Sequence, residues 1–136
     1  MPAYLLDTNA FSALMDEEPT ALARVRSLGP GDRLTICTIV RGEVIYGLDR
    51  MPRGRRRREF EAKAAGLFAR IPCQELSEEV ADAYARIKLD AERAGGPLDD
   101  NDLWIAATAL SLDAVVVTAD TDFQRVRGLR IEDWVA

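Results

Sequence analysis

Residues 95–123 read GGPLDDNDLWIAATALSLDAVVVTADTDF, and this stretch decides the fold class. The residues Gly95-Gly96-Pro97 break the preceding helix, so a new helix is expected to start at Asp99 or Asp100. Residues 114–118 (AVVVT) then form a continuous apolar run, which is typical of a strand buried on both faces of a parallel sheet. The stretch therefore predicts a helix that leads into a buried strand, followed by a polar turn in ADTDF.

The remainder of the chain shows the same alternation of strand-like and helix-like segments. Residues 3–6 predict a short buried strand that ends at Asp7, and Thr8 or Asn9 could cap the helix that follows. The other expected elements are a helix from Pro19, a strand at 34–38, a helix from Ile39, an Arg-rich helix to about Ala69, a short strand in IPCQEL, a helix capped by Ser77, and a strand near Arg130-Ile131. This pattern predicts one domain over residues 1–136, an α/β three-layer sandwich with a mainly parallel central sheet.

Composition excludes several kinds of chemistry. The 136 residues include no histidine, so a Ser-His-Asp triad, a Cys-His pair, a histidine general base and an HExxH zinc site are all absent. Cys37 and Cys73 lie in apolar segments, which predicts buried thiols of a cytoplasmic protein. No apolar run reaches the ~18 residues that span a bilayer, and no secretory signal is recognisable. Any catalysis must use carboxylates, hydroxyls, Lys, Arg or a hard metal ion.

Acidic residues occur where the predicted strands end. Asp7 ends the first strand, and Asp120 follows the AVVVT strand. Glu43 is on the helix after the second strand, and Asp102 is in the first turn of the helix after Gly-Gly-Pro. Ligands of such sheets bind beyond the carboxyl ends of the strands. Four carboxylates at this edge would repel one another unless a hard cation neutralised them, and that arrangement could hydrolyse a phosphodiester.

Each acid also has a purely structural interpretation. Asp7 could be a helix cap, Glu43 a solvated helix residue, and Asp102 a first-turn acid favoured by the helix dipole. Asp120 and Asp122 could be turn formers. The case for catalysis comes from the four acids together.

Three segments carry a resemblance to a known family: LLDTN (5–9), TIVRGEVIYGL (38–48), and GGPLDDNDLWIAATAL with VVVTADTDFQRVRGLRIEDW (95–134). In their order and spacing the chain resembles the PIN-domain family, and within it the VapC-type toxins of prokaryotic toxin–antitoxin pairs. The first motif is weak alone, whereas the last is strong because many positions fall in register. The resemblance implies a PIN-like fold and a metal-dependent endoribonuclease that leaves a 5′-phosphate and a 3′-hydroxyl.

The resemblance also implies roles for individual residues. Asp7 and Asp102 would be the main ligands of Mg²⁺, with Mn²⁺ as the alternative. Glu43 would orient or deprotonate the attacking water, and Asp120 would complete the metal site, often through water. Asp102 is chosen over Asp99 and Asp100 because it precedes LWIAA. Asp120 is chosen over Asp122 because it follows VVVTA.

Three further residues would support the site. Thr8 and Asn9 would order the first loop, and Thr118 would support the metal-site waters. The expected partners are an RNA substrate and a VapB-like antitoxin, and the protein is expected to form a homodimer and not to associate with a membrane.

A dense basic stretch stands out in a chain whose net charge is −5. It comprises Arg50, Arg53, Arg55, Arg56, Arg57 and Arg58. Arg55–Arg58 could track RNA phosphates, or they could form a solvated helix start balanced by Glu59 and Glu61. Two alternatives to a toxin also stay open, a PIN-domain nuclease acting in RNA processing and a catalytically inert RNA-binding PIN module.

Overall fold

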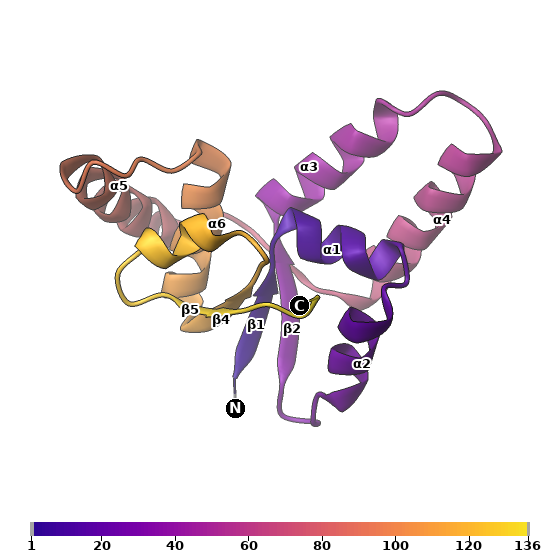
Figure 1. Cartoon of the computed structure of the whole chain (residues 1–136), viewed down its shortest axis with the longest axis horizontal. Coiled ribbons are helices and arrows are strands. Elements are labelled where there is room, and N and C mark those ends of the chain that lie inside the picture. Colours follow the sequence, from indigo (N-terminus) through magenta and orange to yellow (C-terminus); the bar gives the residue numbers. More distant parts are fainter. Residues whose placement is uncertain (1, 136) are drawn as a thin grey trace.

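A computed structural model describes residues 2–135 of the chain. Figure 1 shows a central sheet with helices on both sides. The elements in chain order are β1 (Ala3–Leu6), α1 (Thr8–Met15), α2 (Pro19–Ser27), β2 (Arg33–Cys37), α3 (Thr38–Asp49), α4 (Arg55–Arg70), β3 (Cys73–Gln74), α5 (Glu78–Arg93), α6 (Asp100–Leu112), β4 (Ala114–Val117), the 3₁₀ helix η1 (Thr121–Arg125) and β5 (Arg130–Glu132).

The five strands form one parallel sheet in the order β3-β2-β1-β4-β5. β1 is central, and it pairs with β2 on one side and with β4 on the other. The chain first builds outward from β1 to β2 and β3, and then returns to place β4 on the other side of β1. The strand order therefore reverses between β1 and β4, which is the position where such sheets form a crevice at their carboxyl edge.

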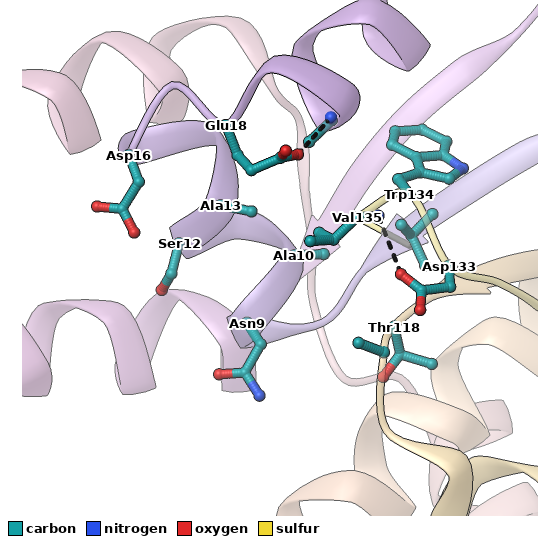
Figure 2. Close-up of a pocket in the computed structure, with 13 residues that line it drawn as sticks. Asn9, Ala10, Ser12, Ala13, Asp16, Glu18, Thr118, Asp133, Trp134 and Val135 are labelled. Atoms are coloured by element: carbon teal, nitrogen blue, oxygen red, sulfur yellow. Dashed lines mark hydrogen bonds between the residues drawn. The ribbon is translucent and has the colours of Figure 1, made fainter.

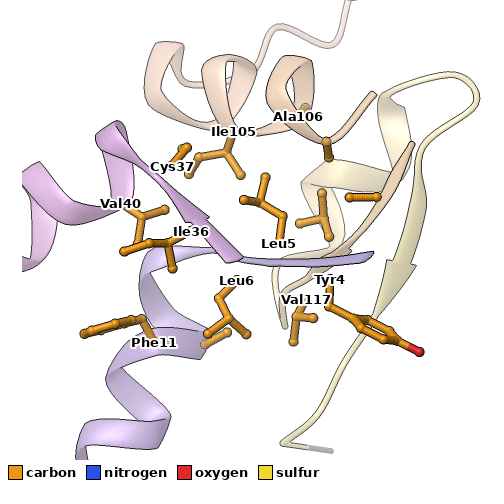
Figure 3. Close-up of a cluster of buried hydrophobic side chains, with 14 of the residues drawn as sticks. Tyr4, Leu5, Leu6, Phe11, Ile36, Cys37, Val40, Ile105, Ala106 and Val117 are labelled. Carbon is orange, nitrogen blue, oxygen red and sulfur yellow. The ribbon is translucent and has the colours of Figure 1, made fainter. Parts of the chain in front are cut away.

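Alternate side chains of β1 pack against helices on opposite faces of the sheet. Figure 3 shows Leu5 directed toward Ile105 and Ala106 of α6, whereas Leu6 is directed toward Phe11 of α1. All five of these residues are buried. Burial of both faces explains why β1 and β4 consist of apolar residues without the polar alternation of a half-exposed strand. The three-layer α/β fold expected from the sequence is confirmed.

Some local expectations differ from the structure. The last three residues of ADTDF begin η1 rather than ending a simple turn, and Thr38 is the first residue of α3 rather than the last residue of β2. Both cysteines are free thiols, but only Cys37 is buried, because Cys73 lies on the short edge strand β3 and is partly exposed. Within residues 2–135, no helix combines the length and apolar character that crossing a bilayer requires.

Candidate active site

The carboxyl ends of β1 and β4 bring together segments from the two ends of the sequence. The Asp7 N–H extends the β1–β4 pairing by donating to the Val117 carbonyl at 3.1 Å. α1 begins immediately after Asp7, and α3 begins immediately after β2. Side chains at these starts share one edge of the sheet because the strands are parallel.

Asp7 caps the helix that follows it. Its Oδ1 accepts a hydrogen bond from the Ala10 N–H at 2.8 Å, so Asp7, and not Thr8 or Asn9, is the N-cap of α1. The side chain is buried, with only 4% of the residue exposed. Burial raises the pKa of Asp7, and the neighbouring Asp120 and Glu43 raise it further, while hydrogen bonds from Thr118 and Ala10 oppose the shift.

Glu43 is held by hydrogen bonds from two other segments. Oε1 accepts from the Thr8 hydroxyl at 2.5 Å, and Oε2 accepts from the Asn101 amide nitrogen at 3.2 Å. Thr8 belongs to α1 and Asn101 belongs to α6, so each carboxylate oxygen is fixed from one side. Glu43 is therefore a positioned acid and not a freely solvated helix residue.

The three aspartates at the start of α6 have different environments. Asp99 is the N-cap and accepts from the Asn101 N–H, while Asp100 accepts from the Tyr84 hydroxyl and from Lys88. Within residues 2–135, no hydrogen bond or ion pair engages the carboxylate of Asp102. Asp102 is thus the member of this group that is left without a structural role.

The electrostatics of Asp102 point to a crowded acidic centre. Partial burial raises the pKa of Asp102 to about 6, and repulsion from Asp99, Asp120, Asp7 and Glu43 adds to the shift. Such coupling places Asp102 within electrostatic reach of the three other expected site acids. A carboxyl group shifted by burial and by specific neighbours is a feature of functional sites.

Thr118 connects the ends of β1 and β4. It is buried, its hydroxyl donates to the Asp7 carboxylate, and its Oγ1 accepts from the Asp120 N–H at 2.9 Å. Asp120 then caps η1 by accepting from the Asp122 N–H. Asp122 itself pairs with Arg125 at 3.3 Å.

The donor set fits a hard divalent cation. The four expected acids lie close enough to raise the pKa of Asp7 and Asp102, and a cation would relieve this repulsion. Within residues 2–135, no three acidic, histidine or cysteine side chains already form a cage around one point. Mg²⁺ commonly uses only one or two protein carboxylates, with waters and substrate phosphates as the remaining ligands, so this arrangement suits it.

A cavity of about 340 Å³ opens beside the acidic centre, between α1 and residues 133–135 (Figure 2). Thr118 and Asn9 lie on its wall, together with the buried Trp134. Asn9 makes no side-chain hydrogen bond to the described part of the chain. Its expected role in ordering the first loop therefore remains a prediction, while Thr8 contacts Glu43 directly.

The arginine stretch lies at the tip of the α3–α4 hairpin, away from the acids. Arg57 is only partly exposed because it pairs with Asp49 and Glu61 and donates to the Met51 carbonyl. Arg55 pairs with Glu59. Arg57 thus stabilises the hairpin turn, whereas Arg56 and Arg58 have exposed side chains.

Sequence reasoning missed Asn101. The residue adjoins Asp102 in the NDLWIAA motif, but its partner Glu43 lies 58 positions away in sequence. The available signal was an amide donor in the first turn of the helix that also carries a site acid. It did not indicate which distant group the amide would meet.

Comparison with known proteins agrees with this geometry. The family model for the PIN domain matches residues 4–129. The chain is 36% identical over 134 residues to Ribonuclease VapC1 of Haemophilus influenzae (strain R2866), covering 96% of this chain and 97% of the relative. It is 30% identical over 135 residues to the tRNA(fMet)-specific endonuclease VapC of Shigella flexneri, covering 98% and 99%. The solved structure of VapBC-1 from nontypeable Haemophilus influenzae is similar, with a TM-score of 0.87, 32% identity, and coverage of 98% and 99%.

Proposed function

This chain belongs to the PIN-domain family, and on that basis we propose that it is a metal-dependent endoribonuclease, the toxin of a VapBC-type toxin–antitoxin pair. The proteins similar to it over nearly their full length are named ribonuclease and tRNA(fMet)-specific endonuclease. The observation that carries the proposal is the mutual repulsion of Asp7, Glu43, Asp102 and Asp120 at one edge of the sheet. An inert binding module would have no need of this unfavourable arrangement.

The site acids would together bind the metal ion. Asp7, Asp102 and Asp120, with Glu43 beside them, would hold a divalent cation, for which we propose Mg²⁺ with Mn²⁺ as the alternative. When bound, the cation would supply Lewis-acid activation of water and phosphate. Thr118 would keep Asp7 and the Asp120 backbone in register through its two hydrogen bonds.

Glu43 would act on the attacking water. Thr8 and Asn101 hold its carboxylate in one orientation, which suits a group that accepts a proton from a water aligned with the phosphorus. The water oxygen bonds to phosphorus as the bond to the 3′-oxygen breaks. The products are then a 5′-phosphate and a 3′-hydroxyl, the latter taking up a proton.

The proposed partners follow from the relatives. Two solved relatives, from nontypeable Haemophilus influenzae and from Salmonella typhimurium, are VapBC complexes, and the second is bound to DNA. We propose a VapB-like antitoxin for this chain, with RNA as the substrate. The homodimer and the organisation of residues 1–136 as a single domain stay predictions.

Cleavage of total RNA by wild type and Asp7→Asn tests the nuclease. Wild type is expected to cleave RNA in Mg²⁺ and to stop in EDTA, while Asp7→Asn is expected to lose nearly all cleavage. End-group analysis should find 5′-phosphates. Equal cleavage by the two proteins, or cleavage that persists in EDTA, would contradict the proposal.

A further inference from the structure

A second cavity lies outside the acidic centre, between the end of α5 and the segment after η1. Its volume is about 340 Å³. Its lining residues are Ile87, Asp90, Arg93, Ala94, Arg125, Val126 and Arg127. Three arginines and a single acidic residue thus line this cavity, in a chain whose net charge is −5. Such a local reversal of charge indicates a site for an anion.

Two of these arginines are not used within the fold. In residues 2–135, neither Arg93 nor Arg127 forms an ion pair, and both are exposed. Arg125 is more constrained, since it pairs with Asp122 at 3.3 Å and donates to the Pro97 carbonyl at 3.4 Å. The buried side chains of Ile87 and Val126 form the floor of the cavity. Arg93 and Arg127 are therefore available to an external anion.

Arg125 connects this cavity to the acidic centre through Asp122. Its partner Asp122 donates its N–H to Asp120, one of the site acids. Its side chain also packs on Gly96, where an added Cβ would lie 3.2 Å from the Arg125 Cδ. Gly96 and Pro97 lead directly into the start of α6, which carries Asp102. The cavity thus adjoins the two segments that carry Asp102 and Asp120.

We propose that this cavity binds a backbone phosphate of the RNA, one or more nucleotides from the scissile bond. The inference rests on the proposed nuclease function. A guanidinium group matches a phosphate with paired hydrogen bonds, and several together attract a polyanion toward a site whose own acids repel it. The cavity would therefore offset the repulsion between RNA and the acidic centre.

The arginines at the start of α4 lie on the other side of the acidic centre from this cavity. Figure 1 shows the α3–α4 tip and the end of α5 on different sides of the junction between β1 and α1. A strand that contacts both flanks would pass over the acidic centre. The cavity beside η1 holds two uncommitted arginines, whereas Arg57 on the other flank is committed to the hairpin.

The test compares Arg93→Gln/Arg127→Gln with a charge-matched control, Arg26→Gln/Arg33→Gln. The control arginines are also exposed and unpaired among the described residues, but they lie on α2 and at the amino end of β2. Binding of a fluorescein-labelled 12-nucleotide single-stranded RNA of mixed sequence is measured by anisotropy in EDTA, across a series of salt concentrations. Thermal melting of all proteins verifies that they are folded.

The cavity variant is expected to reduce the slope of log K against log salt by about 0.7, the contribution of one phosphate contact on a single strand. The control should leave the slope within error of wild type. With Mg²⁺ present, the cavity variant should raise KM for RNA with kcat little changed. Hydrolysis of bis(p-nitrophenyl) phosphate, which has only the scissile phosphate and no second one for the cavity, should be unaffected.

A cavity variant with the same salt slope as the control would overturn the inference, and this result is independent of cleavage. Failure of the nuclease proposal would be seen separately, as RNA cleavage that does not depend on Asp7.

Discussion

Asp7 combines two roles that sequence reasoning treated as competing. It is the N-cap of α1 through Oδ1, and it is also a buried member of the acidic centre. A cap uses one carboxylate oxygen toward the helix, which leaves the other for a ligand. The structural and catalytic interpretations of a strand-terminal aspartate are therefore compatible.

This double role predicts that two substitutions of Asp7 will differ. Asp7→Asn should abolish cleavage while keeping the melting temperature of the metal-free protein at or above that of wild type, because Asn caps as well as Asp and carries no charge. Asp7→Ala should abolish cleavage and also lower stability by about 1 kcal/mol through loss of the cap. Urea denaturation in EDTA measures both. Equal stability of the two variants would show that the cap contributes nothing.

Asn101 is expected to act through Glu43. Asn101→Ala removes the donor to Oε2 and should lower kcat by about 10- to 100-fold, the range seen when a residue that orients a catalytic group is lost. RNA binding in EDTA should not change, because Asn101 does not contact the cavity beside η1. A fall in affinity with an unchanged kcat would place Asn101 in substrate binding instead.

At the scale of elements, the strands and helices were largely predictable and the contacts between them were not. Apolar runs and breaking residues indicated every strand and every α-helix of residues 2–135 to within a few positions, because burial on two faces leaves a clear pattern. The choice of Asp102 rested on motif order, and its environment supports it. The link from Asn101 to Glu43 could not be predicted, since it depends on how α3 and α6 approach each other.

The first turn of α6 predicts opposite effects for two neighbouring aspartates. The pKa of Asp102 is raised to about 6, so its ionised form destabilises the fold, and this destabilisation grows as pH rises through 4 to 6. The pKa of Asp100 is lowered by hydrogen bonds from Tyr84 and Lys88, so its ionised form stabilises the fold. In EDTA at pH 7.5, Asp102→Asn should melt above wild type and Asp100→Asn below it.

Melting curves at pH 5 and pH 7.5 test whether ionisation of Asp102 destabilises the fold. The advantage of Asp102→Asn over wild type should shrink at pH 5, where wild-type Asp102 is already largely protonated. An advantage that is the same at both pH values would mean that Asp102 titrates as an ordinary exposed acid.

The α3–α4 hairpin predicts unequal roles for adjacent arginines. Arg57→Ala should destabilise the protein by about 1 kcal/mol, because it removes two ion pairs and two hydrogen bonds to backbone carbonyls of the turn. Arg58→Ala, on an exposed side chain without an ion pair in the described chain, should change stability by less than about 0.5 kcal/mol. Urea denaturation of both variants measures the difference. Equal effects would show that the contacts of Arg57 do not stabilise the turn.

At the scale of the whole molecule, metal binding should act on stability as well as on activity. A ligand that binds only the folded state at one hundred times its Kd stabilises it by about 2.7 kcal/mol. Mg²⁺ should therefore raise the melting temperature of EDTA-treated wild type, and the shift should largely disappear in Asp102→Asn. Differential scanning calorimetry measures the shift, with Ca²⁺ and Na⁺ as controls at matched ionic strength. An equal Mg²⁺ shift in wild type and Asp102→Asn would place the ion elsewhere.

The central position of β1 has a consequence for synthesis of the protein. Asp7 leaves the ribosome before its neighbour strand β4 and the acids Asp102 and Asp120, which follow 95 to 113 positions later. Because domains form as their segments emerge, Asp7 and Glu43 are present in the nascent chain well before β4 can pair with β1 and bring Asp120 beside them. The acidic centre of an RNA-degrading enzyme is thus completed only after translation has passed Asp120.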